Sequence, residues 1–221
     1  MNLHFEERHA QHGYRIGIAT LDAEKSLNAL SLPMIEALAG KLAAWADDPS
    51  IACVLLRGNG PKAFCAGGDV LQLVQACREK PGQIPELARR FFADEYRLDY
   101  RIHTYPKPLI CWAHGYVMGG GMGLMKGASI RIVTPSSRLS MPEISIGLFP
   151  DVGGSWFLAR LPGKLGLFLG LAVRLGLGLG GHDARGRRHE RRDQVGHDLA
   201  LVLGAAPEGA PLLESSRHVA V

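Results

Sequence analysis

One arrangement occurs twice in this chain: a short apolar run, then a glycine-rich loop, then a helical pattern. The apolar runs are 51–56 (IACVLL) and 109–113 (LICWA), and glycines follow them at 58–68 and 115–123. The run at 51–56 is typical of a strand that is buried on both faces, and the run at 109–113 predicts another short apolar strand. Strands of this kind that alternate with helices predict an α/β fold built in layers.

Other periodic segments extend this pattern along the first 171 residues. Beside the two runs above, we expect strands at 14–21 and 130–134, and helices at 33–45, from about Val70, at 85–103 and from Gly119 onward. The length of 221 residues is ample for one domain with a buried core.

Residues 172–221 have a different composition. From Leu175 onward the chain has no Phe, Trp, Tyr, Ile, Met, Cys, Lys, Asn or Thr, and GLGLGGHDARGRRHERRDQ has no amphipathic period. We therefore expect a core domain at 1–171 and an atypical tail at 172–221. Two interpretations of the tail stay open: a flexible, disordered segment, or the product of a shifted reading frame in a GC-rich gene, which the composition favours.

Composition limits the function classes. The chain carries 25 Lys and Arg against 21 Asp and Glu, a formal net charge of +4, and 47% of its residues are hydrophobic. These values exclude a disordered or collagen-like chain. The basic residues form no stripe interleaved with aromatic residues, so we expect no nucleic-acid partner. No apolar run reaches the ~18–20 residues that cross a bilayer, so we expect no membrane partner.

Cysteine usage bears on the compartment and on metal binding. The four cysteines, at 53, 65, 77 and 111, form no CxxC pair and no Cys/His cluster with zinc spacing. This pattern predicts no metal site and a reducing, cytoplasmic compartment. The start MNLHFEERHAQHG is polar and carries no hydrophobic signal-peptide segment.

The first glycine loop, AFCAGGD at 63–69, leads from a strand into a helix. Such a loop can turn backbone N–H groups toward an anion or a polarised carbonyl. The alternative is a plain strand-to-helix turn that needs a positive φ at Gly67 or Gly68. The loop is not a P-loop, because GxxxxGK[ST] occurs nowhere in the chain.

The second glycine loop, HGYVMGGGMG at 114–123, begins a helix whose free N–H groups favour an oxyanion. Its glycines do not match the dinucleotide pattern GxGxxG. We expect His114 to be packed or hydrogen-bonded rather than a base. Two such loops are more informative than one, because an oxyanion hole needs two donors on one oxygen.

Three carboxylates are candidates for chemistry. Glu143 and Asp151 lie in the mostly apolar segment SMPEISIGLFPDVGG, where burial raises a carboxyl pKa and permits acid–base or nucleophilic work. Alternatively they cap turns or helices, with Asp151 as an N-cap. Glu95 falls on the apolar stripe of the 85–103 helix, where it must snorkel, pair with an Arg or face a polar cavity.

Taken together, these segments resemble the crotonase superfamily of enoyl-CoA hydratases and isomerases. AFCAGGD at 63–69 and HGYVMGGGMGL at 114–124 are similar to its two oxyanion-hole segments, and the resemblance covers about residues 14–170. Within the superfamily, DEYRLDYRI at 94–102, YPKP at 105–108 and the segment 141–171 resemble the 3-hydroxyisobutyryl-CoA hydrolase branch most closely.

The resemblance implies a fold and a substrate. The fold is a crotonase-like ββα spiral core, with an incomplete C-terminal helical part because the hydrolase branch is considerably longer. The resemblance also implies that the N–H groups of Ala66 and Gly120 hold the thioester oxygen. The residues Gly67, Gly68 and Asp69 would lie along the CoA chain.

The same resemblance assigns the three carboxylates. Glu143 and Asp151 would be catalytic, with Glu143 acting as general base or as nucleophile. Glu95 would bind substrate in the acyl pocket and, with Asp151, hold the 3-hydroxyl group and tune the pKa of Glu143. No cofactor is implied, because CoA is part of the substrate.

One departure separates two chemistries. Hydratases of the superfamily carry a Glu three residues after the middle glycine of GGG, whereas this chain has Gly123 there. That loss favours thioester hydrolysis, as in valine breakdown. Two alternatives stay open: an enoyl-CoA hydratase or isomerase, and a truncated chain without catalysis that still binds CoA thioesters. Assembly of the chain into a homo-oligomer also stays open.

Overall fold

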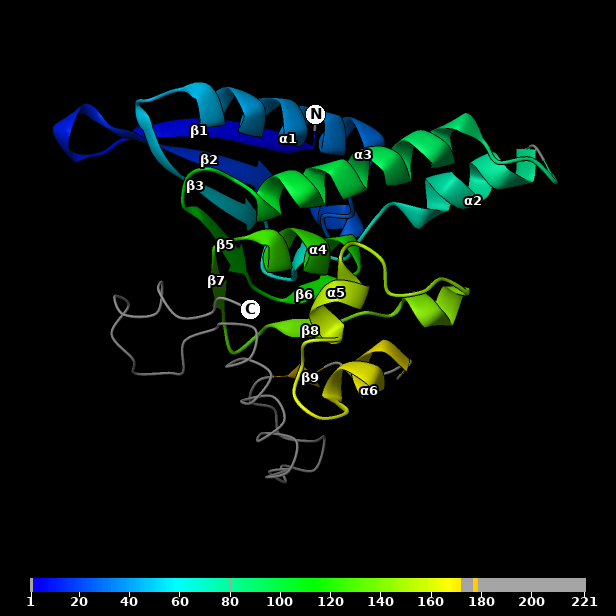
Figure 1. Cartoon of the computed structure of the whole chain (residues 1–221). Coiled ribbons are helices and arrows are strands. Elements are labelled where there is room, and N and C mark those ends of the chain that lie inside the picture. The colour runs from blue at the N-terminus through cyan, green and yellow to red at the C-terminus, as the bar shows by residue number, and fades with distance from the viewer. Residues whose placement is uncertain (1, 80, 172–176, 179–221) are drawn as a thin grey trace.

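The computed structural model describes residues 2–79, 81–171, 177 and 178. These residues form two β-sheets with helices packed around them (Figure 1). The larger sheet has the strand order β1-β2-β3-β5-β7, and the smaller sheet has the order β4-β6-β8-β9. The expected α/β fold is confirmed.

The elements have the following bounds. The strands are β1 (Leu3–His9), β2 (Arg15–Leu21), β3 (Ile51–Gly58), β4 (Ala63–Cys65), β5 (Leu109–Ala113), β6 (Tyr116–Met118), β7 (Ile130–Val133), β8 (Arg138–Ser140) and β9 (Leu177–Gly178). The α-helices are α1 (Leu32–Asp47), α2 (Val70–Glu79), α3 (Glu86–His103), α4 (Gly120–Gly127), α5 (Gly154–Leu158) and α6 (Leu165–Leu171). Short 3-10 turns are η1 (Gln11–Gly13), η2 (Glu24–Ser26) and η3 (Glu143–Ile146). The strands and helices expected from the sequence agree with these bounds to within two residues at each stated end.

A ββα unit repeats along the chain. In each unit the first strand joins the larger sheet, the second joins the smaller sheet, and a helical segment follows: β3-β4-α2, then β5-β6-α4, then β7-β8-η3. The strands β3, β5 and β7 are parallel neighbours, and so are β4, β6 and β8. This repeat is the expected ββα core. The second strands escaped the sequence analysis because three residues are too few to show a period of two.

The sequence analysis also missed β1. This strand pairs with β2 in antiparallel register from Leu3↔Leu21 to His9↔Arg15. Of its seven residues only Leu3 is fully buried, so the apolar alternation that marks a strand is weak. Charged side chains on an edge strand also block pairing with another chain.

The strand β3 is less buried than expected. Ile51, Val54 and Leu56 are buried, but Ala52 is exposed and Leu55 is half-buried. One face of the strand therefore packs in the core while the other is only partly covered. This corrects the expectation of burial on both faces.

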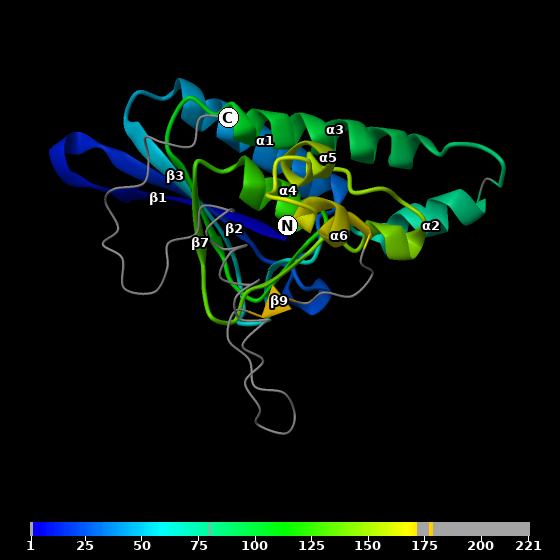
Figure 2. The same cartoon turned by 60° about the horizontal axis from the view of Figure 1, so that its bottom comes forward.

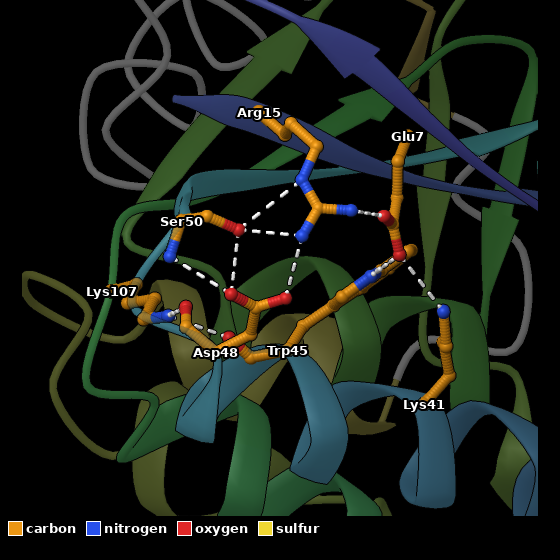
Figure 3. A network of polar contacts seen from close by, with 7 residues as sticks. All are labelled: Glu7, Arg15, Lys41, Trp45, Asp48, Ser50 and Lys107. Carbon is orange, nitrogen blue, oxygen red and sulfur yellow. Dashed lines mark hydrogen bonds and ion pairs between the residues drawn. The ribbon is translucent and has the colours of Figure 1, made fainter. Parts of the chain in front are cut away.

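Helix α1 is fixed to the edge of the larger sheet by its Trp45 and by a polar network (Figure 3). Glu7 of β1 accepts hydrogen bonds from Trp45 Nε1 at 2.8 Å, from Lys41 Nζ at 3.0 Å and from Arg15. The bonds from Trp45 and Lys41 hold the pKa of Glu7 below its usual value. Lys107, just before β5, donates to the Trp45 carbonyl oxygen at 2.6 Å. The network joins β1, β2, α1 and the approach to β5.

Helix α3 runs alongside α1 (Figure 1, Figure 2) and packs against α4 on its other side. Of the expected tail 172–221, Leu177–Gly178 forms β9, antiparallel to β8. The rest of that tail lies outside the described residues. Within the described ranges, no helix is both long and apolar enough to pass through a membrane.

A substitution at Gly17 tests the packing of α1. A methyl group on Gly17 would lie 2.7 Å from the buried indole ring of Trp45, so Gly17→Ala should lower the free energy of unfolding by about 1–3 kcal/mol. Gly40→Ala is the matched control, because Gly40 is exposed on α1 with nothing within 4 Å of the added carbon. It should raise stability by up to about 1 kcal/mol. Urea unfolding measures both, and an unchanged Gly17→Ala variant would contradict the packing.

Candidate active site

The two glycine loops lie against each other. They follow β4 and β6, which are parallel neighbours in the smaller sheet. Both loops therefore begin at the carboxyl ends of their strands, on the same side of that sheet. A methyl group on Gly67 would lie 3.3 Å from the Met118 carbonyl oxygen and 3.6 Å from the Gly120 nitrogen. Gly67 and Gly119 both have a positive φ, of 103° and 48°. Glycine is needed at both turns, as one interpretation of the first loop predicted.

The N–H groups of these loops are not all available. Ala66 N–H donates to the Leu27 carbonyl oxygen at 3.0 Å, so this group is already used. Within the described ranges, the N–H groups of Gly67 and Gly68 have no acceptor. Gly120 N–H is also free, because it opens α4. This corrects the expectation for Ala66: the first loop offers Gly67 or Gly68 as the donor beside Gly120.

The loop residue Asp69 has a local structural role. Its carboxylate accepts a hydrogen bond from Gln72 N at 3.4 Å, at the start of α2. This is the position and the contact of an N-cap. The expected contact of Asp69 with the CoA chain stays a prediction.

His114 connects the second glycine loop to the loop after β3. Its Nε2 lies 2.7 Å from the carbonyl oxygen of Gly60. The expectation of a hydrogen-bonded histidine is confirmed.

The Glu143 carboxyl faces the second glycine loop. Glu143 begins η3, with two residues between it and the end of β8, and is only 6% exposed. A methyl group on Gly119 would lie 3.1 Å from Glu143 Oε1. Neither carboxyl oxygen of Glu143 has a hydrogen-bond partner among the described residues. Burial and the charge of Asp151 raise its pKa to about 7.

Glu95 meets the same loop from the other side. It lies on the buried face of α3 with Phe91, Leu98 and Ile102 and is 3% exposed, as the apolar stripe predicted. A methyl group on Gly120 would collide with Glu95 Oε1. Burial, Asp151 and Glu143 raise the pKa of Glu95 to about 8. Of the alternatives for this residue, snorkelling and pairing with an Arg are excluded by its burial and by its lack of an ion pair within the described ranges.

Asp151 bonds to α3 rather than capping α5. Its Oδ2 accepts a hydrogen bond from Tyr96 Oη at 2.8 Å. The N-cap of α5 is Gly153, and it makes no side-chain capping bond. Burial raises the pKa of Asp151, while the Tyr96 bond opposes that rise. The N-cap interpretation is therefore wrong, because the carboxylate points to the carboxyl cluster on α3.

A fourth carboxyl, Asp99, escaped the sequence analysis. It lies one helical turn after Glu95 and is 9% exposed, and neither oxygen has a hydrogen-bond partner among the described residues. Burial, Glu95 and Asp151 raise its pKa well above the usual value. The helical spacing of four from Glu95 was the signal that placed it on the same face.

Three glycines of α4 allow α3 to approach closely. A methyl group on any of the three would lie within 3 Å of a side chain of α3. The facing pairs are Gly120 with Glu95, Gly123 with Asp99, and Gly127 with Ile102. A side chain at position 123 would have no room, because Asp99 and Val152 occupy that space.

The site has the properties of an acid–base centre. Burial and neighbouring carboxyls raise the pKa values of Glu95, Asp99 and Glu143, and burial raises that of Asp151. The values for Glu143 and Glu95, about 7 and about 8, lie near neutral pH. A carboxyl with a pKa near 7 can donate or accept a proton at that pH. A cavity of about 520 Å³ opens beside Asp151, between α3, α4 and the 149–157 segment. Within the described residues, no three His, Cys, Asp or Glu side chains are placed to bind a metal.

Comparison with known proteins places this chain in a family. The sequence model of the enoyl-CoA hydratase/isomerase family matches residues 16–184. The chain belongs to this family, which confirms the resemblance to the crotonase superfamily.

The chain is also similar to individual proteins of known name or structure. The mitochondrial 3-hydroxyisobutyryl-CoA hydrolase of Xenopus tropicalis is 47% identical over 155 residues, which are 70% of this chain and 39% of that protein. A carnitinyl-CoA dehydratase structure from Mycobacterium thermoresistibile matches with a TM-score of 0.70 and 40% identity, over 80% of this chain and 48% of that one. An enoyl-CoA hydratase structure from Rhodobacter sphaeroides matches with a TM-score of 0.69 and 34% identity, over 94% and 61%. The chain spans about two fifths of the length of the curated relatives that it matches.

The burial of Glu95 predicts a pH-dependent stability. The pKa of Glu95 is raised from 4.5 to about 8 in the folded chain, so between these values the folded state binds more protons than the unfolded state. The free energy of unfolding should therefore fall as pH rises through this window. Glu95→Gln should remove part of that fall, on the order of a few kcal/mol, since one pKa unit is worth about 1.4 kcal/mol.

Urea unfolding at about pH 5 and about pH 8 measures the effect. Glu86→Gln is the control, because Glu86 lies exposed in the first turn of the same helix. Glu95→Gln should gain stability over wild type at the higher pH, whereas the control should follow the wild type. An identical pH dependence for wild type and Glu95→Gln would contradict the burial of this carboxyl.

Proposed function

We propose that this chain hydrolyses an acyl-CoA thioester, with 3-hydroxyisobutyryl-CoA giving 3-hydroxyisobutyrate and CoA. The observation that carries the proposal is the Glu143 carboxyl, buried against Gly119 of the second glycine loop with a pKa near 7. A group that changes protonation near neutral pH beside free backbone donors suits acyl transfer. The matched hydrolases, whose names state this substrate, support the choice of acyl group.

The backbone donors act on the thioester oxygen. Gly120 N–H and the N–H of Gly67 or Gly68 would hold this oxygen as it gains negative charge in the tetrahedral intermediate. One such donor is typically worth roughly 3–4 kcal/mol of transition-state stabilisation. These donors are fixed in place before substrate binds, because the loops are held by β4, β6 and the start of α4.

Glu143 supplies the second part of the reaction. As general base it takes a proton from water while the water oxygen attacks the carbonyl carbon; as nucleophile its own oxygen attacks, and water then cleaves the resulting anhydride. In both routes the carbon–sulfur bond breaks and CoA leaves as the thiol. The step needs no cofactor besides the CoA that belongs to the substrate.

Asp151 and Glu95 would bind the acyl group. Glu95 lies against Gly120 of the second glycine loop and is held by the packing of α3. Asp151 is held by its hydrogen bond from Tyr96, the residue after Glu95 on α3. A carboxyl kept neutral by burial donates a hydrogen bond as well as accepting one. A hydroxyl on the acyl group satisfies such a pair, which fits the 3-hydroxyl of the proposed substrate.

A second candidate is an enoyl-CoA hydratase. The solved hydratase and dehydratase structures support it, and Glu95, with a pKa of about 8 beside Gly120, offers a second carboxyl acid. The filled space at Gly123 speaks against it, because a carboxyl from α4 cannot join Glu143 on one water.

The thiols support a proposal for the compartment. Cys65 and Cys111 are buried, all four cysteines are free, and burial raises the pKa of both buried thiols. A reducing, cytoplasmic location fits these free thiols.

Release of CoA thiol from 3-hydroxyisobutyryl-CoA tests the main proposal. Glu143→Gln should lower kcat by about 10²–10⁴-fold, because the Gln amide neither accepts the proton nor attacks the carbonyl. Ellman's reagent or a thiol-selective dye follows the reaction. Glu86→Gln, exposed on α3, should keep the wild-type rate. Equal rates in wild type and Glu143→Gln would contradict the role of Glu143.

Crotonyl-CoA separates the second candidate. A hydratase removes the enoyl absorbance near 260–280 nm without releasing thiol, whereas the proposed hydrolase leaves crotonyl-CoA absorbance unchanged. Loss of enoyl absorbance that depends on Glu143, with no thiol release from either thioester, would replace the main proposal by the hydratase.

A further inference from the structure

Val152 has a backbone conformation that its side chain disfavours. Its φ is +44°, and of the non-glycine residues with positive φ in the described ranges it alone is β-branched. A β-branched residue in the left-handed region is strained by contact of its side chain with the backbone. Gly153 and Gly154 follow directly. Position 152 itself, however, does not carry glycine, the residue type that adopts this φ without strain. Such strain persists only when the surrounding packing fixes the residue.

The packing around Val152 comes from α3 and α4. Its side chain is 5% exposed. A methyl group on Gly123 would lie 2.7 Å from Val152 Cβ and 2.8 Å from Asp99 Oδ1. The Cβ of a branched residue cannot move without its backbone, so this contact tolerates no extra carbon. Gly123, Asp99 and Val152 therefore fill one another's space.

One of these helices, α3, also fixes the residue before Val152. Tyr96 of α3 donates to the Asp151 carboxylate at 2.8 Å. Two consecutive residues of the loop are thus held by the pair of helices, one through a hydrogen bond and one through van der Waals contact. The Asp151 carbonyl oxygen also accepts a hydrogen bond from Gly154 N–H, which closes the turn around Val152. The Val152 contact joins this turn to α4.

We infer that Val152 is a positioning residue: its strained side chain, seated on Gly123, locks the 147–153 loop and fixes the Asp151 carboxyl in the active site. The strain in Val152 is offset by the packing that it makes. The kinetic part of this inference rests on the proposed hydrolase, whereas its structural part does not. Val152 touches no reacting atom and acts through Asp151.

Val152→Gly is the first test. Glycine accepts the positive φ without strain but makes no contact with Gly123, so the loop should loosen. Hydrogen exchange of backbone amides in 147–153, followed by mass spectrometry, should become at least 10-fold faster. The value of kcat/KM should fall by about 10- to 100-fold, since small misplacements of an active-site group cost rates of this order. The pH profile should change with it, because Asp151 raises the pKa of Glu143.

His12→Gly is the matched control. His12 is an exposed residue with a φ of +59°, in the turn between β1 and β2. It has the same kind of strain but lies outside the site. This variant should leave kcat/KM and the exchange of 147–153 within about twofold of wild type, which separates the contact of Val152 from mere relief of strain.

A double-mutant cycle tests the contact itself. Gly123→Ala alone should push Val152 away and lower kcat/KM by at least as much as Val152→Gly. The double variant Gly123→Ala with Val152→Gly should lose less than the sum of the two single effects. Glycine at position 152 removes the clash with Val152 Cβ, while the clash of the added methyl group with Asp99 Oδ1 remains. Gly127→Ala, on the same helix but facing Ile102, should combine additively with Val152→Gly in its effect on the unfolding free energy.

The outcomes test the positioning role of Val152 separately from the proposed hydrolase. Faster exchange in 147–153 with a lowered kcat/KM supports the positioning role. Exchange and kcat/KM within twofold of wild type for Val152→Gly would overturn it, and so would full additivity of Gly123→Ala and Val152→Gly. If wild type releases no thiol, the proposed hydrolase fails, and the exchange rates and the Gly123 cycle in unfolding free energy still decide the role of Val152.

Discussion

Three side chains of α3 lie directly on three glycines of α4, and this contact sets the form of the whole site. The missing Cβ atoms let the two helices approach more closely than larger residues allow, so Glu95 and Asp99 are buried instead of solvated. The same contact places Glu95 beside the Gly120 N–H and leaves Gly123 as the seat for Val152. Glu95 and Asp99 of the carboxyl cluster, and the contact of the Asp151 loop with α4, take their positions from this one interface.

The interface works against stability. Buried carboxyls without hydrogen-bond partners cost free energy, most of all when ionised. Here Glu95, Asp99 and Glu143 all have such oxygens among the described residues. A chain selected for stability alone would place apolar residues on this stripe of α3. The apolar remainder of the core, from Trp45 under the larger sheet to Leu98 and Ile102 on α3, offsets the cost. Local rules are broken where a functional site lies.

Local sequence patterns predicted the outline of the fold and several residues of the candidate site. The apolar runs, the helical stripe that includes Glu95 and the two glycine loops are all short-range signals, and they appear in the structure as strands, a buried helix face and strand-to-helix turns. The expected burial of the 51–56 strand on both faces is wrong. Contacts between segments distant in sequence determined the features that these patterns did not predict. Ala66 N–H is used because the segment at Leu27 lies beside it, a contact with no local signature. The three-residue strands were too short to read, and the bond of Asp151 to Tyr96 joins segments far apart in sequence.

The alternation of strands between two sheets has a consequence for folding. The glycine loops belong to successive ββα units, and they meet only after β4 has paired with β6 across an intervening helix pair. Contacts between residues this distant in sequence form slowly, because loop-closure entropy is lost before the contacts stabilise the chain. The N–H groups of the two loops therefore come together late, when the second unit docks on the first. During refolding, the contact between Gly67 and the second glycine loop should form with tertiary packing and lag behind helix formation.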